Sequence, residues 1–428
     1  MSRAFQLESV SDETKKKIMK DLVIKIEPNS FNPYLPPTII YPFEVVDDDI
    51  AYIPFAYACD FSRPDLKSFP RTSCKFSGEL RSSQKRVKEE TIVDLNNYGS
   101  TIISCYPGFG KTSVAINIAT KIHMKTLIIA HRIILIDQWT QSISKFCPTA
   151  TVQTLTPKSV KKDCDFYIMN AINVVKRPRS DYTDIAFVVV DEIHLIMSEV
   201  LSKCMNMLTP RYLLGLSATP YREDGMNILI DLFFGTKKIH KKLFRQHTVY
   251  RVDTGFVPDM KLAKNGKVDW GSVLESQCTH IGRNELIIRI IKNFPDRVFL
   301  VLCKRVNQGN YIVDRLREEG EDVTSLIGKQ QTYEQKSRIL VGTASKTCTG
   351  FDHPRLDAMI MASDIQSYYV QYIGRCMRTE TVVPIIFDIV DKNPILEKHF
   401  KTRCSVYLEH GGTVKNFGKI FPNFNINL

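Results

Sequence analysis

The segment CYPGFGKT, residues 105–112, limits the possible folds of this chain more than any other stretch. The apolar run TIISC precedes it, and a segment with apolar side chains at positions 114, 116, 118 and 119 follows it, so a strand, a loop and a helix are expected in that order. The backbone N–H groups of such a loop and the positive end of the helix dipole bind phosphate. We therefore expect Lys111 to reach the β- and γ-phosphates of a nucleotide, and the Thr112 hydroxyl to ligate Mg²⁺.

One position of this loop departs from the usual phosphate-loop pattern. Cys105 stands where glycine is usual, but Gly108 and Gly110 supply permissive backbone within the loop. The alternative is an ordinary turn that contains Gly-Lys-Thr by chance. We favour a nucleotide site, because a strand before the loop and a helix after it are the context that a phosphate-binding loop requires.

Two carboxylates follow another apolar run. Asp191 and Glu192 end the segment FVVVDE, and the carboxyl end of a strand is where an open α/β sheet binds its ligands. Asp191 is suited to hold Mg²⁺, and Glu192 is suited to orient and deprotonate an attacking water molecule. The alternative is an acidic pair that caps a helix. Further along, LLGLSATP places Ser217 and Thr219 in a tight turn just beyond the acidic strand.

Continuous apolar runs separated by helix-length segments predict the fold class. Runs such as TLIIA, FVVV and LLGL lie between residues 76 and 225, and runs such as RVFLVL and VPIIFDI lie after residue 281. Strands that are apolar throughout are covered on both faces, which is typical of parallel α/β sheets. We predict an α/β chain with two tandem lobes, and its expected parts are a small N-terminal module at 1–75, a first lobe at 76–225, a basic linker region at 226–280, a second lobe at 281–392 and a C-terminal helical tail at 393–428.

The formal net charge of +12 favours a polyanionic partner. Nucleic acid is a better candidate than a membrane, because no apolar run approaches the roughly 20 residues that span a bilayer.

The start of the chain, MSRAFQLESVSDETKKK, shows no apolar core of a signal peptide. Eleven cysteines without a CxxC pair predict reduced thiols in a reducing compartment, cytoplasmic or nuclear, and argue against a zinc site.

The ordered segments GFGKT, DEIH, SAT, GTASKTCTGFDHP and QYIGRCMR resemble the motifs of superfamily 2 helicases of the DExH type. The resemblance covers residues 76–390 and implies two RecA-like lobes. HRIILIDQW and PYRED are most similar to the branch of XPB-type helicases and restriction-enzyme motor subunits. HTVYRVDTGFVP and the short C-terminal end are most similar to transcript-release helicases of poxviruses and other large DNA viruses.

The resemblance assigns further residues to the nucleotide. It implies that Gln84 reads the adenine, since an amide can pair with both a donor and an acceptor on one base edge; a solvated glutamine is the alternative. It implies that Gln371, Arg375 and Arg378 face the γ-phosphate from one side of a helix, with ordinary surface arginines as the alternative. The remaining assignments are Gly350 and Asp352 near the ribose or the arginines, and His194, Ser217 and Thr219 in coupling the nucleotide to the second lobe.

The resemblance also implies contacts to the backbone of a nucleic-acid strand, which are insensitive to sequence and strongly dependent on salt. By position these contacts are His131, Arg132, Asn170, Lys304, Arg305 and Thr343. Relatives usually carry threonine where Asn170 stands. A basic cluster is either a further phosphate-binding stripe or a solvated helix face, and it comprises Lys237, Lys238, Lys241, Lys242 and Arg245. Trp139 is expected in the core.

These features predict a monomeric ATP- and Mg²⁺-dependent helicase or translocase. We expect it to move 3′–5′ on DNA or an RNA–DNA hybrid, with DNA favoured, and to act with the transcription machinery; if the chain is viral, we expect it in the host cytoplasm and the virion. Two alternatives stay open, an ATP-dependent RNA helicase and a nucleic-acid-binding subunit that has lost turnover. The enzyme is favoured because the residues that a subunit without turnover usually loses are all present, namely Lys111, Asp191, Glu192, Arg375 and Arg378.

Overall fold

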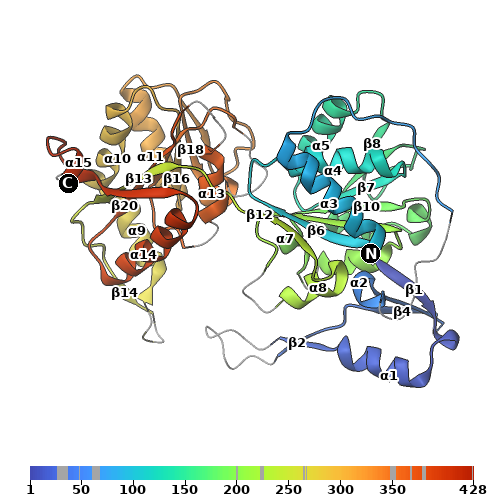
Figure 1. Cartoon of the computed structure of the whole chain (residues 1–428). Coiled ribbons are helices and arrows are strands. Elements are labelled where there is room, and N and C mark those ends of the chain that lie inside the picture. The colour runs from blue at the N-terminus through green and yellow to red at the C-terminus, as the bar shows by residue number, and fades with distance from the viewer. Residues whose placement is uncertain are drawn as a thin grey trace. The chain divides into compact units, whose positions relative to one another are not determined.

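A computed structural model gives the structure of the chain (Figure 1). It describes residues 1–26, 37–47, 49–59, 68–198, 201–221, 226–263, 266, 268–347, 353–366, 369–377, 382–426 and 428. The chain divides into two compact units. Unit 1 comprises Met1–Cys105 and Phe109–Lys241, and unit 2 comprises Tyr106–Gly108 and Lys242–Leu428.

The N-terminal part of unit 1 is a small antiparallel module. Its three-stranded sheet has the order β1-β5-β4, and a separate pair joins β2 and β3. The module is tied to the rest of unit 1 by a backbone hydrogen bond from Ser2 to Leu208, 2.8 Å long. The elements are β1 (Ser2–Gln6), η1 (Leu7–Ser9), α1 (Asp12–Asp21), β2 (Ile24–Ile26), β3 (Thr38–Ile40), β4 (Glu44–Val46), β5 (Ile50–Pro54) and α2 (Phe55–Ala58).

The main sheet of unit 1 is parallel and has the order β12-β6-β11-β10-β7-β9-β8. Its strands are β6 (Ser100–Cys105), β7 (Thr126–Ala130), β8 (Val152–Leu155), β9 (Phe166–Asn170), β10 (Phe187–Asp191), β11 (Tyr212–Ser217) and β12 (Lys238–Lys241). The helices are α3 (Ser82–Tyr98), α4 (Lys111–Ile122), α5 (Ile133–Phe146), α6 (Ala171–Val174), η2 (Arg179–Tyr182), α7 (Ile193–Ile196), η3 (Leu201–Met207) and α8 (Asn227–Phe234).

Unit 2 holds a second parallel sheet, with the order β17-β18-β16-β19-β20-β13-β21. Its strands are β13 (His247–Asp253), β16 (Phe299–Cys303), β17 (Val323–Leu326), β18 (Ile339–Thr343), β19 (Ala358–Met361), β20 (Ile385–Val390) and β21 (Gly412–Asn416). A short antiparallel pair joins β14 (Lys261–Leu262) to β15 (Val268–Asp269). The helices are α9 (Trp270–Thr279), α10 (Ile281–Asn293), α11 (Val306–Glu318), α12 (Ala344–Thr347), α13 (Tyr369–Cys376), α14 (Pro394–Glu409) and α15 (Phe417–Ile420).

The two sheets are built on the same plan. Read from the opposite edge, the first sheet runs β8-β9-β7-β10-β11-β6-β12. When the strands of each sheet are numbered in chain order, the second sheet has the same arrangement. The first strand of each set, β6 or β13, therefore lies next to the last edge strand, β12 or β21. The prediction of two α/β lobes with parallel sheets is confirmed.

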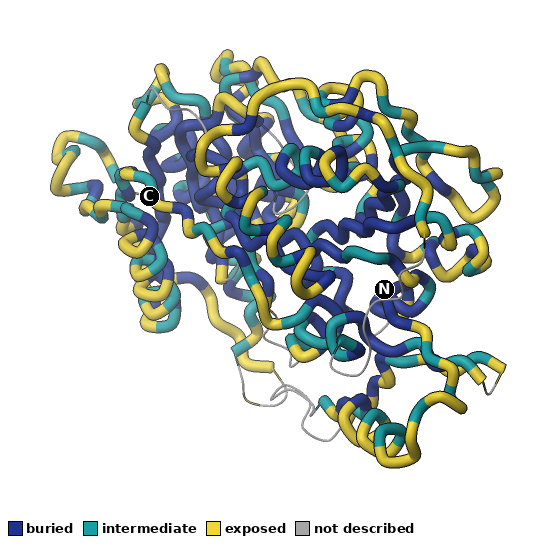
Figure 2. Tube along the Cα trace, turned by 45° about the vertical axis from the view of Figure 1, so that its right-hand side comes forward, coloured by how far each residue is buried: buried dark blue, intermediate teal, exposed yellow. Residues whose placement is uncertain are grey.

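The interior strands are buried on both faces, as their unbroken apolar runs predict (Figure 2, dark blue). In β16, Phe299 and Val301 belong to one apolar cluster, whereas Leu300 and Leu302 belong to another. Alternate side chains of one strand thus pack into separate cores on the two faces of the sheet.

The boundaries of the linker and tail differ from those predicted. The segment 226–280 carries β12, which is the edge strand of the first sheet, and β13, which lies inside the second. The segment 393–428 carries not only helix α14 but also β21, which pairs with β13 along His247–Arg251. Both segments therefore contribute strands to the sheets.

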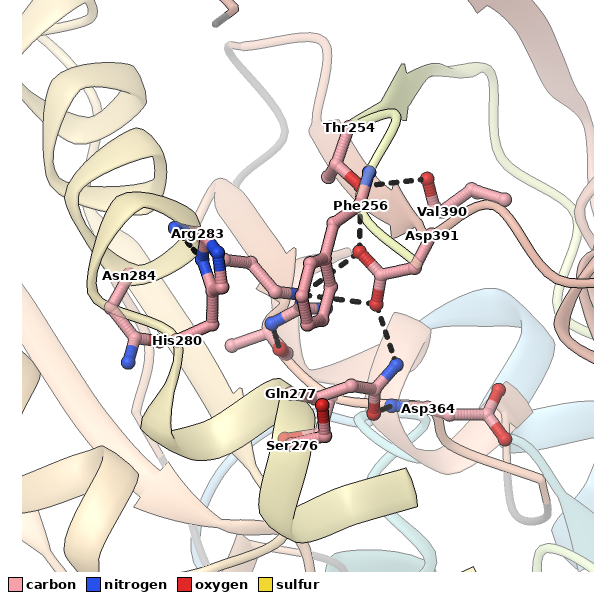
Figure 3. A network of polar contacts seen from close by, with 12 residues as sticks. Thr254, Phe256, Ser276, Gln277, His280, Arg283, Asn284, Asp364, Val390 and Asp391 are labelled. Carbon is pink, nitrogen blue, oxygen red and sulfur yellow. Dashed lines mark hydrogen bonds and ion pairs between the residues drawn. The ribbon is translucent and has the colours of Figure 1, made fainter. Parts of the chain in front are cut away.

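Buried polar side chains hold together the carboxyl edge of the second sheet. Figure 3 shows Thr254, Gln277 and Arg283 converging on the carboxylate of Asp391, which follows β20. The Thr254 hydroxyl donates over 2.7 Å, the Gln277 amide over 2.6 Å and the Arg283 Nε over 3.0 Å. The side chains of Arg283 and Asp391 are fully buried, so the charge of each depends on the other.

Asp391→Ala is expected to lower the free energy of unfolding by about 3–5 kcal/mol, because it leaves the Arg283 guanidinium buried without its counter-charge. Urea unfolding followed by circular dichroism measures this loss. The control is Glu319→Ala, which removes an exposed partner of Lys292 and is expected to leave the midpoint unchanged. Equal midpoints for the two variants would contradict the expectation.

Candidate active site

The phosphate-binding loop predicted at 105–112 joins β6 to α4. Gly108 and Gly110 have φ angles of +83° and +88°, in the left-handed region that favours glycine. A Cβ on Gly110 would also lie 2.4 Å from the Gln84 Nε2 atom. Position 110 therefore requires glycine both for its backbone conformation and for the close approach of a neighbouring side chain.

Lys111 begins α4, and its ammonium group donates a 2.9 Å hydrogen bond to the Cys105 carbonyl. The lysine is thus folded back over its own loop, where a phosphate oxygen would be a stronger, charged acceptor. Burial raises the pKa of the Cys105 thiol to about 11, so the thiol is neutral near pH 7. The cysteine found in place of glycine therefore adds no negative charge to the loop.

Gln84 lies on α3 and forms hydrogen bonds that include one to the phosphate-binding loop. Its Nε2 group donates to the Phe109 carbonyl over 2.8 Å, and its Oε1 atom accepts from the Arg81 backbone N–H over 2.9 Å. The Arg81 guanidinium donates to the same Phe109 carbonyl. Gln84 is 6% exposed, so it is not the solvated glutamine of the alternative interpretation. Its role toward adenine stays a prediction.

The acidic pair lies at the carboxyl end of β10, two strands from β6 in the sheet. Burial and then the adjacent Glu192 raise the pKa of Asp191 to about 7, while a hydrogen bond from Trp139 and the charge of Lys111 act in the opposite direction. Glu192 has a φ of +51°, which is uncommon for a residue with a side chain and is typical of functional sites. A cation bound next to Asp191 and Glu192 would therefore stabilise their charged forms.

Thr112 and Asp191 supply a hydroxyl and a carboxylate, the oxygen ligands that Mg²⁺ uses together with water and phosphate oxygens. Asp191 is 9% exposed at the end of β10, beside a second carboxylate, so a cation there would offset the cost of burying its charge. The residues present therefore fit Mg²⁺ bound with a nucleotide.

Ser217 ends β11 and begins the segment SATP, and it contacts His194, which follows the acidic strand β10. Its hydroxyl lies 2.9 Å from the His194 Nδ1 atom and accepts a 3.0 Å hydrogen bond from the Thr219 backbone N–H. His194 Nδ1 in turn lies 3.6 Å from a Glu192 carboxylate oxygen. The three residues predicted to couple the nucleotide to the rest of the protein thus form one contiguous set with Glu192.

Equivalent strand ends carry the predicted nucleic-acid contacts in both sheets. In unit 1, His131 and Arg132 follow β7, whose last residue Ala130 lies opposite Asn170 at the end of β9. In unit 2, the next two residues after β16 are Lys304 and Arg305, and the last residue of β16, Cys303, lies opposite Thr343 at the end of β18. Arg132 and Arg305 occupy the N-cap positions of α5 and α11.

These side chains are not equally available to a ligand. Lys304 and Arg305 are exposed, whereas Thr343 is buried and the Asn170 side chain caps α6 by accepting from the Ile172 N–H. Burial lowers the pKa of His131 to about 4, so it carries no charge near pH 7. Arg132 is half-buried, so Lys304 and Arg305 are the most exposed cations of this set.

Each side chain of the basic cluster predicted as a phosphate-binding stripe has a partner within its own unit. Lys238 pairs with Asp231 at 3.3 Å, Lys241 with Glu90 at 3.5 Å and Lys242 with Glu409 at 2.7 Å; Arg245 donates to the Met377 carbonyl, and the Lys237 ammonium lies over the Tyr98 ring. These contacts favour a structural role.

In unit 2, Gln371 and Arg375 lie on α13 and are 2% and 8% exposed. The neighbouring Tyr372 hydroxyl donates to the Ala344 carbonyl over 3.0 Å and so ties α13 to the end of β18. Three predicted site residues, Gly350, Asp352 and Arg378, lie outside the described residues.

Comparison with known proteins assigns the family. A model of the "Type III restriction enzyme, res subunit" family matches residues 77–222. "Putative helicase 161L" of Invertebrate iridescent virus 6 is 40% identical over 97% of this chain and 100% of that protein. The chain belongs to the superfamily 2 helicases of large DNA viruses. A second viral helicase of this kind, "Putative helicase 055L" of Frog virus 3, is 31% identical over 85% of the chain and 86% of its own length.

Two further similarities are more distant. "Putative ATP-dependent RNA helicase L396" of Acanthamoeba polyphaga mimivirus is 25% identical over 95% of the chain and 84% of that protein. Among solved structures, "S. cerevisiae Dbp5 bound to RNA and ADP BeF3" covers 77% of this chain and 89% of that one, with a TM-score of 0.57 and 14% identity. At that identity the structural similarity shows the helicase fold alone. Within the described segments, none of the helices combines the length and the apolar character needed to cross a bilayer.

One polar contact of this helicase does not follow from its sequence. Trp139, expected only as a core residue, is 2% exposed and donates its indole N–H to the Asp191 Oδ2 atom over 2.8 Å. The segment HRIILIDQW gave its position on a helix but no sign of the acceptor, which lies 52 residues away in the chain.

Proposed function

We propose that this chain is an ATPase stimulated by nucleic acid, which uses ATP hydrolysis to translocate 3′–5′ along one strand and to release transcripts in viral transcription. The observation that carries the proposal is the placement of Lys111 and the Asp191–Glu192 pair at the carboxyl ends of strands in one parallel sheet. That edge is where open α/β sheets bind nucleotides.

The residues of unit 1 have distinct roles in this proposal. Loop N–H groups and Lys111 hold the β- and γ-phosphates, and Thr112 and Asp191 hold Mg²⁺, which supplies charge to neutralise the phosphate oxygens. Glu192 orients the attacking water and accepts its proton. His194 lies next to both Glu192 and Ser217, the first residue of the segment SATP, so His194 and Ser217 report the state of the nucleotide to the rest of the chain.

The residues predicted from unit 2 remain part of the proposal. Gln371, Arg375 and Arg378 act on the γ-phosphate and Gly350 and Asp352 complete the site, as the family resemblance implies. An arginine that stabilises the transferring phosphoryl group is worth about 10³–10⁵ in rate.

An ATP-dependent RNA helicase is the second candidate. It is favoured by the name of the mimivirus relative and by the RNA in the Dbp5 structure. The test is the rate of ATP hydrolysis with single-stranded DNA, duplex DNA, RNA and RNA–DNA hybrid. Stimulation by DNA or hybrid supports the first candidate, stimulation by RNA alone supports the second, and ATP binding without hydrolysis supports a subunit that has lost turnover.

Arg305→Ala is expected to weaken nucleic-acid binding equally for all sequences and to reduce the slope of log K against log[salt] by about 1, because one phosphate contact is lost. Fluorescence anisotropy of a labelled oligonucleotide at several salt concentrations measures both quantities. Lys158→Ala, at an exposed loop position of unit 1, is the control and should keep the wild-type slope. An unchanged slope for Arg305→Ala would remove this residue from the interface.

A further inference from the structure

The indole of Trp139 is the feature that the proposed mechanism leaves unused. Trp139 lies on α5, which follows β7, and β7 is the direct neighbour of β10 in the sheet. This arrangement places the indole N–H 2.8 Å from the Oδ2 atom of Asp191. Both residues are buried, at 2% and 9% exposure, so water competes little for this hydrogen bond.

A tryptophan that only fills space does not need this acceptor. Buried indole N–H groups find a partner, and most side-chain hydrogen bonds are made to backbone groups or water. Here the partner is the carboxylate that the proposed function assigns to Mg²⁺. Groups that hydrogen-bond a metal-ligating carboxylate fix its orientation and affect metal affinity.

We propose that Trp139 is a positioning residue for Asp191: its indole N–H fixes Oδ2 and leaves Oδ1 as the oxygen available to the Mg²⁺ of a bound nucleotide. The inference rests on the proposed function, because it needs Asp191 to act as a metal ligand. Trp139 touches neither nucleotide nor metal in this assignment and acts only through the carboxylate.

Trp139→Phe and Trp139→Tyr form a matched pair of variants. Both lose the second indole ring and keep an aromatic side chain, but only tyrosine keeps a group that can donate to a carboxylate. The affinity for ADP is measured by calorimetry with excess Mg²⁺ and again with EDTA, and the ratio of the two affinities isolates the metal contribution. A role in packing alone would change both affinities or neither.

Trp139→Phe is expected to lower this ratio by roughly 10- to 100-fold, with the affinity in EDTA unchanged. Trp139→Tyr is expected to recover at least part of the ratio. A wild-type ratio in Trp139→Phe, or equal losses in the two variants, would overturn the inference. A wild-type chain whose ADP affinity does not respond to Mg²⁺ would instead overturn the proposed function itself.

A spectroscopic measurement keeps the inference testable if the Trp139 variants do not fold. The chain has two tryptophans, so Trp270→Phe leaves Trp139 as the only indole emitter. Trp270 lies in unit 2, at the start of α9. The Trp139 emission is expected to change on addition of ADP with Mg²⁺ but not on addition of ADP with EDTA. Identical emission in the two conditions, at concentrations where calorimetry shows Mg²⁺-dependent binding, would overturn the inference.

Discussion

Glu192→Gln is expected to lower kcat for ATP hydrolysis by about 10²–10⁴, the usual contribution of a positioned general base. Glutamine keeps the size and the hydrogen-bonding reach of the side chain but cannot accept a proton from water. ATP and nucleic acid should therefore still bind, and the complex should persist because it is not turned over. Phosphate release measures the rate, and equilibrium binding of a fluorescent ATP analogue measures the affinity.

The control for this variant is Glu89→Gln, the same substitution on an exposed part of α3. It should hydrolyse ATP at the wild-type rate. Wild-type turnover in Glu192→Gln would assign the base to another residue. Equal losses of turnover and of nucleotide affinity would mean that Glu192, whose φ is +51°, supports the local backbone rather than the chemistry.

Lys111→Ala is expected to lower kcat/KM for ATP by at least about 10²–10³, because it removes the cation that we propose to contact the β- and γ-phosphates as charge shifts between them. In contrast to Glu192→Gln, it should also weaken ATP binding, since the same contact exists in the ground state. Steady-state kinetics and equilibrium binding together separate the two effects.

The matched control is Lys121→Ala, which lies near the end of the same helix α4 and is exposed. It removes an equal charge from the same element and should keep wild-type kinetics. If Lys111→Ala retains wild-type kcat/KM, the segment GFGKT is not a working phosphate-binding loop, and the alternative of a chance turn would be correct.

The interior of both sheets could be predicted from sequence because its signal is local. Runs such as FVVVD and FLVLC are apolar at every position, and the corresponding strands are buried on both faces. The edge strands could not be predicted in the same way. β12, with the sequence KIHK, has one buried position, and β21, with GTVKN, alternates partly buried and exposed positions; both are rich in polar residues. Their membership in the sheets depends on partners far away in the chain.

In the candidate site, too, local features could be predicted from the sequence and long-range contacts could not. The positions of Lys111, Asp191 and Ser217 at strand ends follow from local motifs. The contacts that these residues make do not, because they join segments that the sequence alone cannot place side by side. The role of Gln84 toward a base stays a prediction, but its contact with the Phe109 carbonyl was not foreseen. Trp139 lies in the core as predicted, but its hydrogen bond to Asp191 was not foreseen. In each case a pattern of apolar residues fixed the helix but not its polar partners.

The common plan of the two sheets has a consequence for anion binding. β13 occupies in the second sheet the place that β6 has in the first, and the first turn of α10 carries Arg283 as the first residue of α4 is Lys111. Lys111 rests against a neutral carbonyl, whereas Arg283 is already neutralised inside the protein by Asp391. A polyphosphate would have to break a buried ion pair to reach Arg283. At Arg283 the second sheet therefore already holds an internal carboxylate, where an external anion would have to displace it.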